Sequence, residues 1–492
     1  MSALLVRGGL VCTAGEAPRR ADILIAHGRI LRVAPDIDAP EAQVIDASDR
    51  IVMPGLVNSH THGHANLAKG AADRWTLEAS LTNGPWMGGA RDEETVYLST
   101  LLGAADMLSK GCTACFDLVY LLPGLEPAHL AAVARAYADA GMRAVLAPMV
   151  ADRSFVESIP GLMQALPADL QAELTGPPPQ AEDMLARLKA LFAEPLPGGI
   201  SCAVAPTIPH QCSDRLITGC AELAAGHDIP LHMHIAESRF QAEVARQVYG
   251  VSPIAYLDDL GVLGPSFVAA HAIWLDGDDL DRLAGAGAAV AHIPASNFRL
   301  GTGIAPLGQM LDREMRVGLA TDGANSSDAL NMFEAMRLAS DASRVWGTPR
   351  ADWLSCAEAF RLGTEGGADV LGLTNAGRIA AGEDADLVLL DLGSVNFLPL
   401  TDPVAQLVTA ENGASVTDVI AAGRVVMREG RLTTIDMADL RARIEDKLPA
   451  WHAATAEARA LSARMEPLIV AHVEGRDQPD LGFTRMVGEG PR

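Results

Sequence analysis

The middle of the chain, from Ile51 to about residue 375, alternates short apolar runs with alanine-rich segments of helical periodicity. The runs have the length of buried strands, and the segments between them have the pattern of covering helices. Eight such strands are the count of a closed (β/α)8 barrel. A long doubly wound sheet is the alternative, but no Gly-x-Gly-x-x-Gly follows an early strand. The predicted strands are 51–58, 112–119, 143–149, 201–206, 229–235, 266–271, 288–293 and 317–321, and the clearest helices are 95–110, 130–141 and 278–287.

The two ends of the chain have a different sequence pattern from the middle. Short strands at Leu4–Val6, Asp22–Ile25 and Ile30–Val33 are separated by glycine-containing turns, which is typical of hairpins. The same pattern returns at 385–390 and 416–426. We therefore predict an α/β fold with a TIM-type barrel and one small β domain assembled from both ends. The predicted parts are 1–52 and 377–435 for the small domain, 53–376 for the barrel, and 436–492 for a helical extension (436–473) with a polar, poorly ordered end.

Length and composition narrow the class of protein. A chain of 492 residues with 49% hydrophobic residues suits a large barrel plus a satellite domain. The net charge of −24 argues against nucleic-acid polymers and anionic membranes as partners. We find no apolar run long enough to span a membrane and no signal peptide at the start. The seven cysteines are scattered and odd in number, which favours a reducing cytoplasm. Cys112 and Cys115 have redox spacing, but their apolar run favours core packing.

The segment Pro54–His62 ends in two histidines two residues apart. Successive side chains of a strand alternate between its faces, so His60 and His62 point the same way. Two imidazoles that converge at a strand end suit a divalent metal. The alternative is one buried, hydrogen-bonded histidine and one surface histidine.

Polar residues also follow the later apolar runs. The fifth predicted strand contains His232 and His234 and is followed by Glu237, the sixth ends at His271, and the eighth is followed by Asp322. Barrel enzymes place their chemistry at the C-terminal ends of strands. The pattern therefore predicts one catalytic site, and the set is far more specific than any one of its members.

Together these motifs resemble the amidohydrolase superfamily, and within it the branch of mononuclear-metal aminohydrolases that contains adenosine-analogue, guanine and triazine deaminases and hydrolases. The likeness covers roughly residues 1–435, including the composite small domain. The matching segments are Pro54–His62, His234-x-x-Glu237, His271, His292–Asn297, Thr321–Ala324 and Asn331–Ala339.

The resemblance implies one divalent metal held by His60, His62, His234 and Asp322. Zinc is the expected metal, with iron or manganese as alternatives. It would lower the pKa of bound water and create hydroxide as the nucleophile. Glu237 would shuttle a proton from that water to the ring nitrogen and the leaving ammonia. His271 would orient the water or polarise the substrate, and Asp322 would also accept a proton.

The lysines separate two branches of the superfamily. Two-metal members, such as hydantoinase-like enzymes, use a carboxylated lysine at the end of the fourth strand. Residues 201–206 contain none, and the nearest lysine, Lys189, lies outside the strand. We therefore predict a single-metal site, which favours the aminohydrolase branch.

Candidate substrate contacts lie in the loops after the strands, which are 63–95, 120–128, 150–198 and 207–213. His210 and Gln211 follow the fourth strand, where an amide reads a ring edge well. Trp75 and Trp86 suit either stacking on a flat heterocycle or capping the barrel. His292 and Asn297 either contact substrate or hold their loop by hydrogen bonds. Two further residues with open roles are His64, a candidate substrate contact, and His232, which we expect behind the ligands or facing substrate.

The resulting hypothesis is a metal-dependent aminohydrolase that removes an exocyclic amine from a purine, pyrimidine, pterin or triazine and releases ammonia. The alternative within hydrolases is another leaving group, such as an alkylamine or chloride on a triazine, or an acyclic amide or guanidine bond. A catalytically silent metal-binding scaffold is a third possibility, but a scaffold needs no proton shuttle. The resemblance also implies a homo-oligomer, with the helical tail as a candidate contact, acting on a small-molecule substrate.

Overall fold

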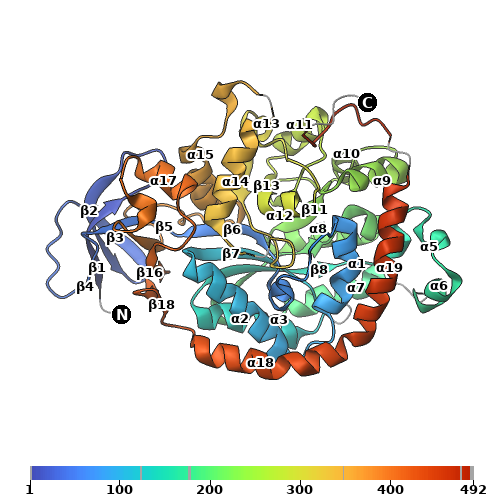
Figure 1. Ribbon diagram of the computed structural model, residues 1–492, viewed down its shortest axis with the longest axis horizontal. Helices are drawn as coiled ribbons and strands as arrows, with labels where there is room; N and C mark the ends of the chain where they lie inside the picture. Colours follow the sequence, from blue (N-terminus) through green and yellow to red (C-terminus); the bar gives the residue numbers. More distant parts are fainter. Residues whose placement is uncertain are drawn as a thin grey trace.

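The computed structural model describes residues 3–121, 125–174, 179–327, 329–346, 348–476 and 479–487. A β-rich unit lies at one end of the molecule, and helices surround a set of parallel strands in the larger part (Figure 1). The predicted fold class, an α/β barrel with a small composite β domain, is confirmed. Parts of the predicted loops at 120–128 and 150–198 and of the polar end lie outside the described residues, whereas the exact division of the chain into domains stays a prediction.

The small domain is one nine-stranded sheet built from both ends of the chain. The N-terminal and C-terminal strands meet where β15 pairs antiparallel with β5, with Leu387 opposite Pro54. Ile23, Ile25 and Leu389 are among the apolar side chains buried in its core. The strands are β1 (Leu4–Val11), β2 (Arg19–Ala26), β3 (Arg29–Ala34), β4 (Gln43–Asp46), β5 (Arg50–Pro54), β15 (Leu387–Asp391), β16 (Val416–Ala421), β17 (Arg424–Arg428) and β18 (Arg431–Leu432).

The barrel strands pair in parallel in sequence order. Between β10 and β11 the backbone N–H of His232 donates to Val204 O at 2.9 Å, and the ring closes where the N–H of Asp322 donates to His60 O at 3.0 Å. Every residue of β7 is buried, as expected of a parallel strand covered on both faces. The strands are β6 (Leu56–Thr61), β7 (Cys112–Val119), β8 (Arg143–Val150), β9 (Ser201–Cys202), β10 (Ala205–Pro206), β11 (Leu231–Ile235), β12 (Phe267–His271), β13 (Ala289–His292) and β14 (Arg316–Leu319).

The first predicted strand, 51–58, is wrong as a single element. Its residues divide between β5 of the small sheet and β6 of the barrel, with Gly55 at the change of direction. The Gly55 N–H pairs with Asp386 O in the small sheet, and the next N–H, of Leu56, pairs with Gly111 O beside the barrel. A Cβ at residue 55 would lie 2.2 Å from Thr113 Oγ1, so only glycine fits. The fourth predicted strand is likewise interrupted, between β9 and β10.

Helices follow most barrel strands and bury their apolar faces against them. Many begin at a side-chain cap, as where Asp92 Oδ1 accepts the Thr95 N–H at 2.7 Å. No helix in the described part of the chain is both long and apolar enough to cross a bilayer. The covering helices are α2 (Glu93–Ser109), α3 (Pro127–Ala140), α7 (Ala181–Leu191), α8 (Asp214–His227), α9 (Arg239–Tyr249), α10 (Pro253–Asp259), α11 (Gly277–Gly285), α13 (Leu307–Leu311), α14 (Met332–Arg344), α15 (Cys356–Arg361), η5 (Leu362–Gly366) and α16 (Gly367–Val370).

Shorter elements lie in the loops beyond the strand ends and at the junction with the small domain. They include four short helical segments and turns in the predicted insertion at 155–198. The elements are η1 (Gly63–Ala68), α1 (Leu77–Gly88), α4 (Phe155–Ser158), α5 (Leu162–Ala165), α6 (Ala168–Leu174), η2 (Pro197–Gly199), η3 (Pro209–Gln211), α12 (Pro294–Arg299), η4 (Arg350–Asp352), η6 (Val395–Phe397) and α17 (Pro403–Thr409).

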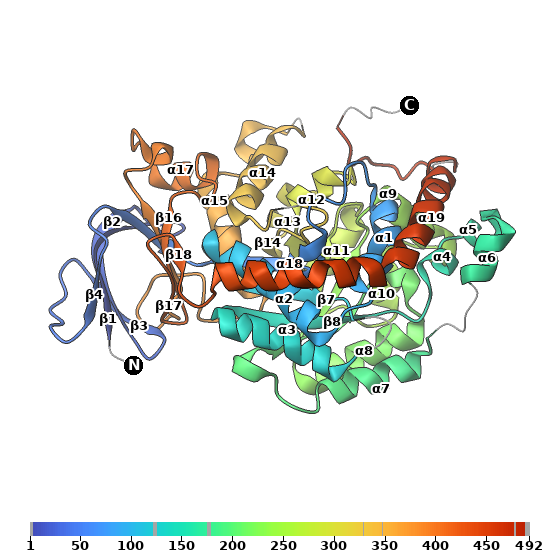
Figure 2. The ribbon, with the colours of Figure 1, turned by 60° about the horizontal axis from the view of Figure 1, so that its bottom comes forward.

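The C-terminal extension forms two helices, α18 (Met437–Ala454) and α19 (Ala456–Glu474), that meet at Thr455. α18 crosses the outside of the barrel next to α2, and α19 turns to run along α1 (Figures 1 and 2). Both helices therefore pack on their own chain. The predicted homo-oligomer stays a prediction.

Gly318 on β14 is a tight point in the closure of the barrel. A Cβ at this position would lie 2.1 Å from Ser59 Oγ and 2.9 Å from Gly367 Cα. We expect Gly318→Ala to lower the free energy of unfolding by about 1–3 kcal/mol, because overpacking forces neighbouring backbone apart. Gly264→Ala is the matched control, since nothing lies within 4 Å of its Cβ. Equal unfolding midpoints for the two variants in thermal denaturation would contradict this packing.

Candidate metal and catalytic site

Histidine and aspartate side chains from separate strands converge at the C-terminal end of the barrel. His60 lies in β6, His62 directly follows it, His234 lies in β11, and Asp322 follows β14. The Nε2 atom of His62 lies 3.2 Å from His60 Nε2 and 3.4 Å from His234 Nε2. Asp322 Oδ1 lies 3.3 Å from His62 Nε2 and 3.8 Å from His60 Nε2. The structure thus brings together the four residues that the sequence suggests as ligands.

These spacings fit a single metal ion. Four ligands about 2.0–2.1 Å from one ion at tetrahedral angles lie roughly 3.3–3.4 Å from one another. The measured distances of 3.2, 3.3, 3.4 and 3.8 Å surround that value. Three imidazoles with one carboxylate form a donor set suited to zinc and similar divalent ions. The residues present therefore fit the metal that the family resemblance implies.

Backbone carbonyls orient two of the imidazoles. His62 Nδ1 donates to Leu118 O at 2.8 Å, and His234 Nδ1 donates to Thr207 O at 3.0 Å. Each bond places the ring proton on Nδ1, so the Nε2 lone pair faces the centre of the site. This arrangement is usual for histidine ligands, whose second ring nitrogen is fixed by a hydrogen bond.

His60 is held by a side chain instead. Its Nδ1 lies 3.2 Å from Nε2 of His232, whose ring packs edge-on against Phe116. His232 is fully buried, and its Nδ1 has no partner among the described residues. It therefore lies behind His60 and does not face the substrate.

Burial keeps the imidazoles in the form that binds metal. Desolvation, followed by repulsion from the neighbouring imidazoles, lowers the pKa of His234 to about 3 and the pKa of His60 well below its ordinary value. Burial alone would raise the pKa of Asp322, but His62, His271 and the Ser296 hydroxyl lower it. Neutral His60 and His234, beside a carboxylate with a lowered pKa, are ready to bind a cation without first losing protons.

Glu237 and His271 lie next to the ligands. His271 Nε2 lies 3.6 Å from Glu237 Oε2, and both side chains are almost fully buried. Burial, with the nearby carboxylates of Asp322 and Glu78, raises the pKa of Glu237 well above its usual value. A buried carboxyl group with a raised pKa is a candidate for proton transfer.

Asn297 fixes the orientation of His271. Its Oδ1 accepts a hydrogen bond from His271 Nδ1 at 2.9 Å, and it is not among the residues that line the cavity. Of the two roles predicted for Asn297, the structure therefore supports the hydrogen-bonding role. His271 itself has φ 65°, and Asp322 has φ 67°. Left-handed backbone at two such non-glycine residues costs energy and is typical of functional sites.

Removal of the Asn297 acceptor tests this orientation. We expect Asn297→Ala to lower kcat by about 10- to 100-fold, the usual effect of losing a hydrogen bond that orients a site histidine. Asn297→Asp keeps an acceptor oxygen and should lose less. Steady-state kinetics on both variants, with metal content measured alongside, separates the two. Wild-type kcat in Asn297→Ala would show that His271 needs no such support.

A cavity of ≈ 370 Å³ opens directly above these residues. His62, His234, His271, Glu237 and Asp322 line one side of it. The rest of the lining is largely apolar and includes residues of α1 and of the loop after β8. Further lining residues are Leu77, Ser80, Leu81, Gly84, Pro85, Met87, Arg153, Phe155, Gln211, Leu300 and Asn325. A polar reaction centre facing an apolar wall is usual for a small-molecule site.

The predicted substrate contacts fall into two groups. Gln211 lines the cavity, as does His64, whose role the sequence leaves open. His210 and His292 are buried outside the lining of the cavity, and burial lowers the pKa of each to about 4.

Cys112 and Cys115 are also buried, in the main core of the barrel.

Trp86 is not among the residues that line the cavity, so of the two roles that the sequence leaves open the structure does not support stacking on substrate. Its indole packs 6.1 Å from Trp451 between ring centroids, and the guanidinium of Arg459 lies 3.7 Å above its ring. Its Nε1 donates to Asn83 Oδ1 at 2.8 Å. The ring points toward the C-terminal helices because it lies on the outer face of α1.

Several supporting residues are not apparent from the sequence. Asp117 on β7 accepts the Gly63 N–H and the Tyr137 hydroxyl, both at 2.8 Å, and so fixes the loop after His62. Ser296 donates to Asp322 Oδ2 at 2.6 Å. Only the polar character of Asp117 within an apolar strand signals its importance, since a buried charge needs partners.

Comparison with known proteins assigns the chain to a family. The model of the Amidohydrolase family matches residues 51–426. This protein belongs to the amidohydrolase family. The predicted superfamily is therefore confirmed, together with its barrel fold.

Curated relatives of this amidohydrolase are deaminases. It is 32% identical over 436 residues to a 5′-deoxyadenosine deaminase of Methanothermobacter thermautotrophicus, covering 88% of this chain and 95% of the relative. It is 31% identical over 438 residues to a 5-methylthioadenosine/S-adenosylhomocysteine deaminase of Pyrococcus furiosus, covering 88% and 97%.

Solved structures of similar fold are also metal-containing hydrolases. An adenosine deaminase of Xanthomonas campestris with bound zinc has a TM-score of 0.79 at 28% identity, covering 92% of this chain and 98% of the other. The atrazine chlorohydrolase TrzN of Arthrobacter aurescens, complexed with zinc, has a TM-score of 0.79 at 26% identity, covering 92% and 100%. These comparisons show that the amidohydrolase is a hydrolase of non-peptide carbon–nitrogen bonds, and the predicted metal-dependent hydrolytic deaminase is confirmed at this level.

Proposed function

We propose that this amidohydrolase deaminates adenosine-type nucleosides, replacing the exocyclic amine of the purine with oxygen and releasing ammonia. The observation that carries the proposal is the buried pair of Glu237 and His271 beside four convergent residues, His60, His62, His234 and Asp322. All of these residues except His60 line one cavity. The relatives supply the substrate class, because the two curated proteins described above are named for 5′-deoxyadenosine and for 5-methylthioadenosine or S-adenosylhomocysteine.

The metal is held by His60, His62, His234 and Asp322 in this proposal. When bound, the metal would act as a Lewis acid and lower the pKa of a coordinated water toward neutrality. Zinc is the proposed metal, because the donor set suits it and two solved relatives contain it.

Glu237 moves the protons of the reaction. Its Oε2 takes a proton from the attacking water and gives it to the ring nitrogen next to the amine-bearing carbon. The water oxygen bonds to that carbon, and the carbon–nitrogen bond then breaks. The remaining proton of the newly bonded hydroxyl passes to the amine, which leaves as ammonia while the hydroxyl becomes the oxo group. The raised pKa of Glu237 suits a group that must both accept and donate protons near neutral pH.

His271 and Asp322 lie beside Glu237 and assist it. His271 carries its proton on Nδ1, where Asn297 accepts it, so Nε2 faces the reacting atoms. It holds the attacking water in line with the ring carbon. Asp322 Oδ2 accepts the Ser296 hydroxyl, and Oδ1 accepts the Gly323 N–H at 2.7 Å and lies 3.3 Å from His62 Nε2. In this proposal the same carboxylate also accepts a proton during the reaction.

The shape of the cavity suits a flat heterocycle. Leu81, Pro85 and Phe155 contribute apolar surface to the cavity, and Gln211 contributes a polar amide to the same cavity. An amide side chain offers a donor and an acceptor, which matches the edge of a purine ring. We propose Gln211 as a contact to the base.

Ammonia release tests the substrate class. The zinc-loaded protein is incubated with 5′-deoxyadenosine, 5′-methylthioadenosine, adenosine, guanine and an aminotriazine. We expect the highest kcat/KM among the adenosine-type nucleosides, and ammonia equal to the oxo product. Turnover of the triazine alone would overturn the nucleoside proposal and favour a triazine substrate, as the likeness to atrazine chlorohydrolase suggests. A cytoplasmic location is also proposed, supported by the free thiols of all seven cysteines.

A further inference from the structure

Helix α1 forms much of the apolar wall of the cavity. Leu77, Leu81 and Gly84 lie on one helical face, at the spacing of successive turns, and line the cavity. This inner face is tied to the catalytic loops by two polar contacts. Glu78 Oε1 accepts the hydroxyl of Ser238 at 2.8 Å, one residue after Glu237, and Ser80 Oγ lies 3.4 Å from Asn325 Nδ2. The position of α1 therefore sets the shape of the substrate space.

α1 is poorly built to hold this position alone. It has only 12 residues, with Gly84 and Pro85 in its interior. Proline removes an internal hydrogen bond and glycine lowers helix propensity. Helices of this length are marginal in water even with favourable sequences, so tertiary packing must fix the helix.

The outer face of α1 is held by α19. The Ser462 hydroxyl donates to Thr82 O at 2.9 Å, and Asn83 Nδ2 donates to Glu466 Oε2 at 2.9 Å. The Arg459 guanidinium stacks 3.7 Å above the Trp86 ring. Such a stack combines a cation–π attraction with the flat packing that arginine allows.

An apolar cluster joins these contacts to the cavity. Ala68, Trp86, Met87 and Trp451 are its buried members, and Met87 also lines the cavity. Arg91 lies beside the Trp451 ring, 5.9 Å from its centroid, and donates to the carbonyl of His64. The C-terminal helices thus contact both the cavity wall and the loop that follows the metal-binding histidines.

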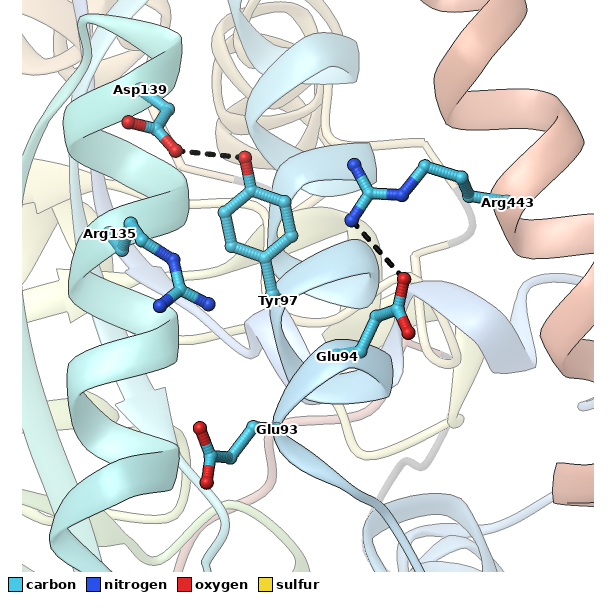
Figure 3. A pocket seen from close by; sticks show the side chains of 6 residues that line it. All are labelled: Glu93, Glu94, Tyr97, Arg135, Asp139 and Arg443. Carbon is cyan, nitrogen blue, oxygen red and sulfur yellow. Dashed lines mark hydrogen bonds and ion pairs between the residues drawn. The ribbon is translucent and has the colours of Figure 1, made fainter.

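α18 is anchored by charge to the start of α2. Lys447 Nζ lies 2.8 Å from both Asp92 Oδ2 and Glu94 Oε2. Figure 3 shows Arg443 directed toward Glu94 beside the ring of Tyr97. The Arg443 Nη2 atom lies 3.3 Å from Glu94 Oε1. These pairs hold α18, and through it α19, on the barrel.

We propose that α19, acting through Arg459 and Glu466, is a specificity-determining element that positions α1 as the cavity wall and so sets how tightly the substrate is held. The proposal rests on the proposed nucleoside deaminase function. The helices lie beyond residues 51–426, the part matched by the family model, so the family barrel supplies the chemistry and the extension tunes the pocket.

Arg459→Met tests the proposal, because methionine keeps an unbranched apolar stem and removes the planar cation. We expect KM for the best nucleoside to rise by about tenfold with kcat changed by less than about twofold, since the loss falls on the wall and not on the metal group. The ratio of kcat/KM between nucleosides with small and large 5′ groups should also move toward one. Metal content should stay at the wild-type level.

Arg441→Met is the matched control. This arginine is highly exposed on α18 and pairs only with Glu445 in the described structure. The KM of the Arg441→Met variant should therefore equal the wild-type value. Glu466→Ala is a second, independent test variant, because it removes the hydrogen bond that Glu466 accepts from Asn83 of α1. Amide hydrogen exchange over residues 77–88 should be faster in both test variants, while the barrel strands exchange as in the wild type.

The outcomes separate two failures. A wild-type protein that releases no ammonia from any nucleoside counts against the proposed function, and the exchange data still report whether α19 holds α1. An active wild type with unchanged KM and unchanged discrimination in both test variants overturns the role of α19. A fall of kcat together with metal content, at constant KM, also overturns it, because α19 would then act through general stability.

Discussion

Glu237→Gln is expected to abolish measurable turnover while the protein keeps its fold and its metal. The substitution preserves the size of the side chain but removes the group that accepts and donates protons beside His271. General acid–base catalysis contributes about 10²- to 10⁴-fold, so we expect kcat to fall by at least about a hundredfold. Ammonia release and metal analysis on the same preparation provide the measurement.

The control for this variant is Glu222→Gln on the exposed surface of α8, which should have wild-type kcat. Retained activity in Glu237→Gln would show that another group transfers the proton. His271 would then be the first alternative, since its Nε2 faces the same part of the cavity.

His234→Ala is expected to remove the metal and the activity together. His234 is buried, and its Nε2 faces the metal group because Nδ1 is bonded to Thr207 O. Loss of a residue that merely orients a ligand weakens metal binding by about 10- to 100-fold, so loss of the ligand itself should weaken it by more than about 100-fold. Metal stoichiometry after dialysis against a weak chelator measures the effect.

His227→Ala serves as the comparison, because His227 is an exposed histidine at the end of α8. It should bind metal as the wild type does. Full metal occupancy in His234→Ala would rule out the four-residue ligand set.

The strands and the main site residues were predictable because they follow simple physical patterns. A parallel strand buried on both faces reads as a continuous apolar run, and the predicted 112–119 coincides with β7. His234 and Asp322 each stand in or just after such a run, where parallel strands bring their ends to one edge. This regularity carried the prediction of fold and site together.

Other features depend on contacts that no local pattern encodes. The run 51–57 reads as one continuous apolar stretch before Asn58, so the change of sheet at Gly55 is visible only from its close approach to Thr113. Helix α1 was not predicted because Gly84 and Pro85 interrupt its pattern, and α19, which lies far along the chain, supports it. For Trp86 the sequence left the direction of the ring open, and the direction depends on that same support.

The source of the oxygen in the product tests the central claim, hydrolytic deamination at the metal group. The zinc-loaded protein is incubated with 5′-deoxyadenosine in water labelled with heavy oxygen, and the product is analysed by mass spectrometry. We expect one labelled oxygen in each oxo product, with one ammonia released for each. No labelled product and no ammonia from any adenosine-type nucleoside, with metal fully bound, would contradict the assignment of this amidohydrolase as a nucleoside deaminase.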